Sequence, residues 1–437
     1  MVSCAILVSR PSALLAHTKL VSSSPHADER LEASPRLISL MFSEILMKGV
    51  SRFVITGPSG DTIRLEPAVP DSMGSHTIAG RPLVPLSAGV YQVHWVAAGR
   101  DGHPERGSFS FSVAGSSSVL PVEMSKDSAV NEDQMDAFAL GRTMTIARWL
   151  GFLALFSIVG AVAFRYAILG RVAHQFGDGD PFLHIASVSA ATYGLFAAVA
   201  LVLATVVKLY GQSVAMQDIP AESILLATGW GWAWCAQMLA CLVAIAGFAM
   251  AHRAPRNGWP LAALAAAVLV VTPAATGHAI GSDEALFAVP LDIVHVLAGS
   301  TWLGTLSVIL IVGIGAAAKT PGTVSLGARV ATMVNSFSPL ALTCGALMVA
   351  TGVVASLLRL EPLSSLWTSW YGRILIVKLA FVALLFAVGA WNWRRVKPSL
   401  GGDEGVKALR FSARVELAVA AMVLMVTAFL VALPLPE

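Results

Sequence analysis

Two short segments, far apart within the first 115 residues, contain side chains that suit a metal ion. The first segment, "AHTKL", carries His17, and the second, "GRDGHPERG", carries Asp101 and His103. Because Asp101 and His103 are two residues apart, an extended chain presents them on the same side. Imidazole nitrogen and carboxylate oxygen suit Cu(II), and a free amine on His17, exposed by cleavage before it, would complete a tetragonal site. The spacing predicts such a site if the first and last strands of this region are neighbours.

The elements that must position these residues are short strands. Residues 17–115 alternate apolar runs with Gly, Pro and Ser, as in "RFVITGPSGDTIRLEP" and "GVYQVHWVAAG". A period of two bounded by turn residues predicts an all-β, Ig-like sandwich. We expect residues 1–16 to be a signal-like segment that directs export, although its start lacks Lys and Arg. The Ser-rich, acidic stretch 116–143 is predicted as a linker.

The remainder, residues 144–437, has the composition of a membrane domain. The whole chain is 56% hydrophobic and only 13% charged, with a mean hydropathy of +0.72, whereas a soluble domain carries about 25% charged residues. Apolar runs long enough to cross a bilayer as helices predict an all-α polytopic bundle of eight transmembrane helices. The runs are 144–168, 185–207, 222–250, 260–280, 287–316, 332–356, 372–393 and 412–433.

Basic residues in the connecting loops predict the orientation. They concentrate in alternate loops, at Arg171, Arg253, Arg256, Lys319, Arg329, Arg394, Arg395, Lys397, Lys407 and Arg410. By the positive-inside rule these loops are cytoplasmic. The sandwich and the loops 208–221, 281–286 and 357–371 are therefore expected on the periplasmic or extracellular side of a bacterial inner membrane. A net charge of +3 spread over loops excludes a nucleic-acid surface.

Ionisable residues inside the apolar runs indicate a second candidate site. Asp292 and His295 are three residues apart near the outer end of one run, so they share a helical face. His278 ends the preceding run, and antiparallel neighbours would bring it toward His295. Because such residues are expensive in lipid, they predict a copper site facing the bundle interior. Five scattered methionines could be soft donors for Cu(I), but methionines in apolar helices are expected to be core residues; they are Met216, Met238, Met250, Met333 and Met348.

The segments "HTKLVSSSPHADERLEASPRLISLMFSE" and "LSAGVYQVHWVAAGRDGHPERGSFSFSV" resemble the CopC family of periplasmic copper carriers. The resemblance covers nearly all of residues 17–113. In that family the mature chain starts at a histidine, which binds Cu(II) together with a D-x-H pair. The resemblance therefore implies that His17, Asp101 and His103 are the Cu(II) ligands. The dense methionine segment of a second, Cu(I) site is not matched here, so no Cu(I) site is expected in the sandwich.

The membrane part resembles the CopD family, notably in "ATGHAIGSDE", "LDIVHVLAGSTWLGTL" and "FSPLALTCGALMVATGVVAS". This resemblance implies copper import, homeostasis and resistance, with copper as Cu(I) or Cu(II) in the membrane. Partners would be copper ions, the lipid bilayer and other periplasmic copper carriers. No P-loop is present, so we expect downhill or gradient-coupled transport.

Three other functions remain open at the level of the sequence. An oxidative copper enzyme would need an open coordination position that Asp101 would occupy, so we expect a protein that is not an enzyme. A haem-binding redox protein could use His278 and His295 as axial ligands. A copper sensor or scaffold without translocation would have the same ligands and no flux.

Overall fold

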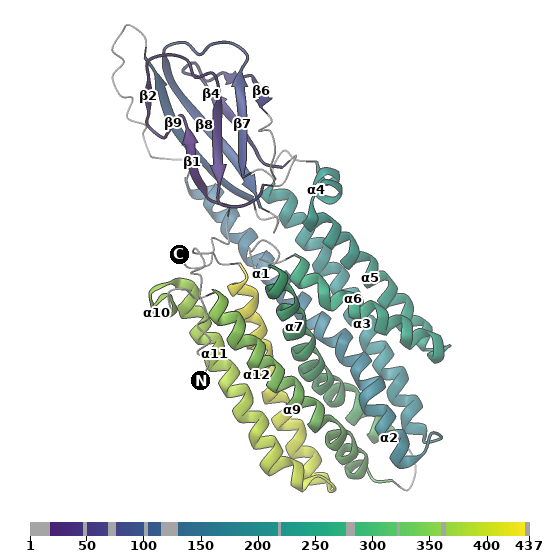
Figure 1. Cartoon of the computed structure of the whole chain (residues 1–437). Helices are drawn as coiled ribbons and strands as arrows, with labels where there is room; N and C mark the ends of the chain where they lie inside the picture. The colour runs from purple at the N-terminus through teal and green to yellow at the C-terminus, as the bar shows by residue number, and fades with distance from the viewer. Residues whose placement is uncertain are drawn as a thin grey trace, which may run out of the picture.

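The computed structural model describes residues 18–46, 50–68, 76–99, 104–114, 130–216, 220–276, 285–320, 324–359 and 364–432. A β-sandwich formed by the first part of the chain stands at one end of a bundle of long helices (Figure 1). This architecture confirms the predicted fold class.

Two sheets form the sandwich. One sheet has the strand order β1-β3-β7-β6, and the other has the order β2-β9-β8-β4-β5. Most pairs are antiparallel, whereas β2 runs parallel to β9. The strand bounds are β1 Leu20–Ser24, β2 Arg30–Leu31, β3 Ile38–Phe42, β4 Arg52–Thr56, β5 Thr62–Ile63, β6 Leu65–Ala68, β7 Thr77–Pro82, β8 Gly89–Ala98 and β9 Pro104–Val113.

Every second side chain of β8 points into the core between the two sheets. Tyr91 and Val93 are fully buried, as the period of two predicts, and Trp95 lies against the same cluster. The ring of Tyr91 stacks on Phe111 of β9 at 5.5 Å between centroids. Its hydroxyl donates to the carbonyl of Ser87 at 2.8 Å, so its polar end is satisfied inside the domain.

Eight helical segments of the described chain are long and apolar enough to cross a membrane, as predicted. They are Gly141–Phe176, Pro181–Val214, Gly229–Ala251, Pro255–Ala275, Leu286–Lys319, Leu326–Leu358, Trp370–Ser399 and Glu404–Leu430. The α-helices are α1 Val130–Ala163, α2 Leu169–Phe176, α3 Pro181–Ala215, α4 Ala221–Ala227, α5 Gly229–Ala251, α6 Pro255–Ala275, α7 Ala285–Val308, α8 Ile314–Lys319, α9 Leu326–Arg359, α10 Ser365–Thr368, α11 Trp370–Trp391 and α12 Asp403–Leu430. Short π-helical turns η1 Phe164–Ile168, η3 Ile309–Gly313 and η4 Asn392–Val396 continue α1, α7 and α11, and the 3-10 turn η5 spans Lys397–Ser399.

Two boundaries differ from the sequence expectation. Helix α1 begins at Val130, inside the stretch 116–143 that the sequence predicts as linker. Its first residues, "VNEDQMDAFAL", are mostly good helix formers, which explains the extension. Lys208, predicted to lie in a loop, is instead inside α3, where its ammonium donates to Gln237 Oε1 of α5 at 3.0 Å.

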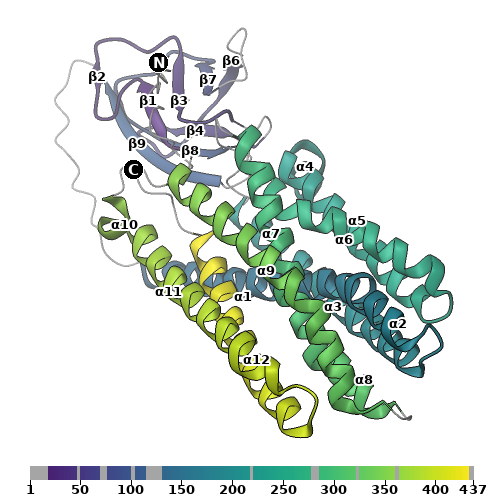
Figure 2. The same cartoon turned by 60° about the horizontal axis from the view of Figure 1, so that its bottom comes forward.

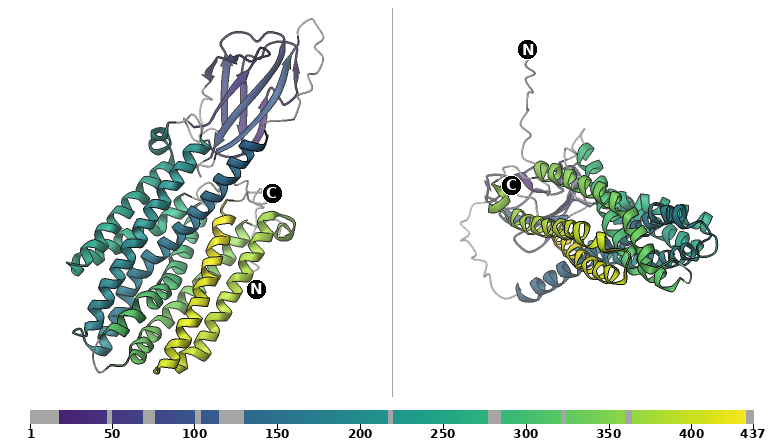
Figure 3. Two further views of the ribbon diagram at one scale, coloured as in Figure 1. Left: turned by 180° about the vertical axis from the view of Figure 1, so that it is seen from behind. Right: turned by 90° about the horizontal axis from the view of Figure 1, so that it is seen from below.

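Helix α1 runs through the middle of the bundle and contacts α3, α6, α7 and α12. Helices α11 and α12 form a pair at one side, and α5 and α6 form a pair at the other (Figure 2). Gly160 of α1 lies against Gly304 of α7, and a Cβ at Gly160 would overlap the backbone of Gly304. These two glycines therefore allow the close approach of α1 to α7. The end of α12 lies at the end of the bundle near the sandwich (Figure 3).

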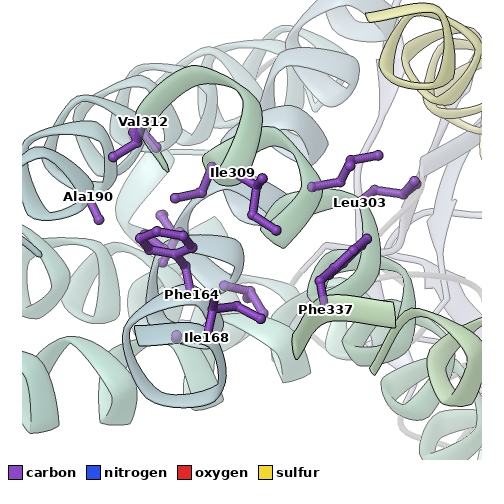
Figure 4. Packing of buried hydrophobic residues seen from close by; sticks show 14 of the residues in the cluster. Phe164, Ile168, Ala190, Leu303, Ile309, Val312 and Phe337 are labelled. Carbon is purple, nitrogen blue, oxygen red and sulfur yellow. The ribbon is translucent and has the colours of Figure 1, made fainter. Parts of the chain in front are cut away.

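The largest buried core fills the centre of the bundle, where η1, α3, α7, η3 and α9 converge (Figure 4). At the end of the bundle away from the sandwich, the buried side chains of Arg329 and Asp180 form a salt bridge with an N–O distance of 3.3 Å. Asp180 also caps α3 by accepting a hydrogen bond from the Phe182 N–H at 2.9 Å. This pair joins the starts of α3 and α9.

A smaller apolar cluster joins the sandwich to the bundle. Val50 and Ala98 of the sandwich are fully buried in one cluster with Met216 at the end of α3, Ile224 of α4 and Trp230 at the start of α5. Burial of apolar surface from both parts fixes one end of the sandwich on these helix ends.

Candidate metal centres

The predicted ligands of the sandwich, His17, Asp101 and His103, lie outside the described residues. The described residues next to these ligands in the sequence nevertheless lie close together. The hydroxyl of Thr18, next to His17, donates to Glu44 Oε2 at 3.4 Å. A Cβ built on Gly99, two residues before Asp101, would overlap the same carboxylate. The beginning of the domain and the start of the β8–β9 connection therefore converge, as the site requires.

Glu44 is the functional candidate that sequence reasoning missed in this domain. Its side chain is buried, 7% exposed, at the point where Thr18 and Gly99 converge. A buried carboxylate is expensive unless it is paired with donors or a metal ion. The available signal was an acidic residue two positions after a buried strand, in "LISLMFSE". Its oxygen atoms are suitable donors for Cu(II).

His295 of α7 has a defined hydrogen bond in the membrane part. Its Nδ1 lies 2.8 Å from the Thr351 hydroxyl of α9. Thr351 has a single hydroxyl proton and donates it to the carbonyl of Leu347 at 2.7 Å. The hydrogen bond between Nδ1 and this hydroxyl orients the His295 ring between α7 and α9. A histidine oriented by an oxygen partner in this way is typical of metal ligands.

Asp292 lies one turn before His295 on α7, and both side chains are half-buried. Their spacing of three residues places them on neighbouring positions of one face, as predicted. His278, the third predicted residue of this site, lies outside the described residues. In the part of the chain that the structure describes, no three His, Cys, Asp or Glu side chains are grouped to hold a metal ion. The described pair alone supplies an incomplete ligand set.

A polar pair that the sequence analysis did not single out lies in a cavity between α7, α9, α11 and α12. The cavity has a volume of about 640 Å³, with Trp302, Phe337 and Phe386 among its apolar lining. Glu416 of α12 also lines it and is 4% exposed. Asn392 Nδ2 donates to Glu416 Oε2 at 2.7 Å. The signal in the sequence was one acidic residue inside the last apolar run.

These features define a class of protein: a polytopic membrane protein with a β-sandwich docked on one end of its bundle, a buried carboxylate in the sandwich and an aspartate and a histidine on one helix of the bundle. Family models match three regions of the chain. They are the CopC domain over residues 20–114, the copper resistance protein D-like N-terminal domain over residues 137–288, and copper resistance protein D over residues 331–430.

Comparison with known proteins agrees with these matches. The sandwich is 35% identical over 103 residues to copper resistance protein C of Xanthomonas campestris pv. juglandis, covering 22% of this chain and 80% of that protein. The chain therefore belongs to the copper resistance proteins, with a CopC domain followed by the CopD regions.

Nearly the whole chain is similar to the copper transport protein CutJ of Bacillus subtilis (strain 168). The identity is 23%, and the match covers 98% of this chain and 76% of that protein. Among solved structures, PcoC, a methionine rich copper resistance protein from Escherichia coli, matches at 33% identity with a TM-score of 0.21. It covers 22% of this chain and 99% of its own.

Proposed function

We propose that this protein captures Cu(II) with its sandwich, on the periplasmic or extracellular side of the bacterial inner membrane, and passes copper inward through the helical bundle. His17, Asp101 and His103 would hold Cu(II), with the Glu44 carboxylate beside them. Copper is the transported substrate, and other periplasmic copper carriers would deliver it to the sandwich.

The observation that carries this proposal is the contact between the two parts of the chain. Residues 99–103, which contain two predicted ligands, connect β8 to β9, whose ends Ala98 and Pro104 are paired. Ala98 is itself buried against the ends of α3, α4 and α5. The connection that carries the ligands is thus tied to the end of the sandwich that docks on the bundle. Copper released there would meet the membrane domain before bulk solvent dilutes it.

The orientation follows from the basic residues. Lys319 ends α8, and Arg394 and Arg395 lie in η4, at the ends of their helices away from the sandwich. With these residues in the cytoplasm, the sandwich and the end of α12 would lie outside. A cytoplasmic reporter fused after Glu437 is expected to be silent, and strong cytoplasmic activity of this fusion would contradict the orientation.

Within the membrane, Asp292 and His295 of α7 would take up copper together with His278. The Thr351 hydroxyl orients the His295 imidazole, since it lies 2.8 Å from Nδ1. A carboxylate one turn closer to the sandwich would attract the incoming cation. These donors support a path that begins at the sandwich end of α7.

Uptake of copper by the full chain in proteoliposomes tests the function, with zinc and nickel compared in parallel. We expect copper uptake to exceed that of both other metals. His295→Gln keeps a hydrogen-bonding side chain but coordinates copper poorly, so it should lose uptake while retaining normal folding. Copper uptake no faster than in protein-free vesicles would refute transport. The remaining function would then be that of a copper sensor or scaffold.

The imidazole of His295, oriented by Thr351, also suits an axial ligand of haem, which makes a redox protein the second candidate. The visible absorption spectrum of the purified protein separates the two functions. We expect no Soret band, and a stoichiometric haem spectrum would replace copper transport with electron transfer.

A further inference from the structure

The cavity between α7, α9, α11 and α12 is long and apolar, and it opens to the outside of the bundle. Along α9 its lining extends from Val334 to Ala350, which is a rise of about 24 Å in a straight helix. Leu342 and Val349 of this lining are 62% and 51% exposed, so the cavity is reached from the surface of the bundle. Helix α9 packs mainly on α7, and α11 packs mainly on α12 (Figure 2). The cavity therefore lies between these two helix pairs.

Charged and amide side chains of the cavity lie toward its end away from the sandwich. Asn392 and Glu416 are hydrogen-bonded there, and Lys397 follows Asn392 by five residues along η4 and η5. In the other direction along α11, Phe386 precedes Asn392 by six residues. Its ring centroid lies 5.2 Å from that of Trp302. The cavity thus has a polar part near one end of the bundle and an apolar part that reaches toward the middle.

Asn392 has a buried oxygen atom that lacks a partner. Its Nδ2 donates to Glu416 Oε2, so Oδ1 is the atom of the amide that remains. Oδ1 is buried and accepts no hydrogen bond from the described residues. A carbonyl oxygen can only accept, whatever the protonation state of Glu416. Because an unsatisfied buried acceptor is costly, a group that complements this part of the cavity must carry a hydrogen-bond donor.

The shape and the polar groups of the cavity define the chemistry of its occupant. The length and the apolar lining suit one hydrocarbon chain that lies along α9. A bare hydrocarbon would leave Asn392 Oδ1 without a donor. An anionic head group would place its charge beside the oxygen atoms of Asn392 and Glu416, and an ammonium head group would lose its hydration close to the like charge of Lys397. A neutral hydroxyl group supplies the donor without burying a charge.

We propose that this cavity is a binding site for an amphiphile with one long hydrocarbon chain and a neutral hydroxyl head group. The hydroxyl donates to Asn392 Oδ1, and the chain extends from there toward Trp302 and Phe386. Long-chain alcohols and monoacylglycerols share this chemistry. The bound molecule joins the pair α7 and α9 to the pair α11 and α12, so it stabilises the bundle. This inference is independent of copper transport, because no candidate copper ligand lines the site.

Equilibrium binding of tritiated hexadecanol to the delipidated full chain in detergent tests the site. Unlabelled hexadecanol, monopalmitoylglycerol, hexadecane and hexadecanoate serve as competitors of equal chain length. We expect saturable binding of one alcohol per chain and a higher melting temperature when it is bound. Hexadecanol should compete about tenfold more strongly than hexadecane or hexadecanoate, since only a hydroxyl satisfies the amide oxygen. Monopalmitoylglycerol shows whether a glycerol head group is also accepted.

Two sets of variants separate the head group from the chain. Replacing both Asn392 and Glu416 by Leu removes the polar pair, so hexadecanol and hexadecane should then compete equally. Ala346→Phe places a ring in the cavity from an exposed position of its lining and should abolish binding of the alcohol. Leu347→Phe is the matched control, because Leu347 is the next exposed residue of α9 and does not line the cavity. It should bind the alcohol like the parent.

Three results would overturn the proposal. Equal competition by hexadecanol and hexadecane in the parent would show that water satisfies Asn392 and that the cavity accepts any hydrocarbon chain. Binding of the alcohol by Ala346→Phe at the parental affinity would place it elsewhere on the protein. Absence of saturable binding, together with a dimer that Ala346→Phe converts to a monomer in light scattering, would assign the cavity to an interface with a second copy of the chain.

Discussion

Ala98, the last residue of β8, and Met216, at the C-terminal end of α3, are buried in one apolar cluster. The first residue belongs to the strand that leads into the predicted Cu(II) ligands, and the second belongs to a membrane helix. Under the proposed function, this contact would make copper capture and delivery local events at one end of the sandwich. A freely tethered sandwich would instead present copper over a volume set by its linker.

Val50→Asp tests whether this docking matters. The substitution places a charge in an apolar cluster in which Val50 is fully buried, at a cost of several kcal/mol to the docked state. We expect copper uptake in proteoliposomes to fall by about tenfold as the docked population is lost. Cu(II) binding by the full chain, measured by electron paramagnetic resonance, should be unchanged.

Val54→Asp provides the control, because Val54 is an exposed residue of β4 in the same domain. This variant should transport like the parent. If Val50→Asp also transports like the parent, docking through this cluster is dispensable for delivery.

Gly99→Ala tests the role of Glu44 without altering any predicted ligand. A Cβ at this position would overlap the Glu44 carboxylate and crowd the Thr18 hydroxyl, so the carboxylate must move. We expect Cu(II) affinity to fall by about 10- to 100-fold, as for other displaced groups near a metal ion. Titration of the full chain with Cu(II) measures this change.

Gly57→Ala is the comparison for this variant, because a Cβ there meets no atom closer than 3.4 Å. Its Cu(II) affinity should match the parent. Unchanged affinity in Gly99→Ala, with the domain still folded, would remove Glu44 from the vicinity of the copper.

The architecture could be predicted because local sequence patterns determine it. Alternation in "YQVHWV" predicted which residues of β8 face the core, and Tyr91 and Val93 are buried there. Run lengths predicted eight spans, since a helix needs about 20 apolar residues to cross a bilayer. The position of Lys208 was wrong because its charge suggested a loop, whereas Gln237 of α5 accepts a hydrogen bond from its ammonium inside the bundle.

The parts of the sites that the sequence did not reveal depend on contacts between distant segments. Glu44 is a candidate because Thr18 and Gly99 meet at its carboxylate. Thr351 matters because α7 and α9 are antiparallel neighbours with a particular register. Neither contact leaves a periodic pattern, so only the folded chain identifies these residues. The predictions for His17, Asp101, His103 and His278 stay predictions, since these residues lie outside the described ranges.

Thr351→Val tests the hydrogen bond that orients His295. Valine has nearly the shape of threonine but cannot form the hydrogen bond with Nδ1, so the imidazole loses this orienting partner. We expect copper uptake to fall by about 10- to 100-fold, the usual cost of losing such an orienting partner. Thr351→Ser retains the hydroxyl and should restore uptake. Equal transport by the valine and serine variants would show that the hydrogen bond has no part in copper binding.

Asn392→Ala tests the hydrogen-bonded pair Asn392 and Glu416 in the cavity between α7, α9, α11 and α12. The substitution removes the donor to Glu416 Oε2 and leaves a buried carboxyl group without this partner. We expect a loss of stability of roughly 1–3 kcal/mol, seen as a lower melting temperature in detergent. Asn392→Asp, in contrast, places a second carboxyl group beside Glu416 and should destabilise the protein further at neutral pH.

The double variant Asn392→Leu with Glu416→Leu separates a structural role of this pair from a role in transport. Replacing both partners by apolar groups of similar size removes the unmet hydrogen bond, so the melting temperature should return close to the parental value. Copper uptake then gives the decisive measurement. A stable double variant that transports normally would show that the pair has no part in transport. A stable double variant without uptake would assign the Glu416 carboxylate to transport, because the bundle would be intact and only the polar lining of the cavity changed.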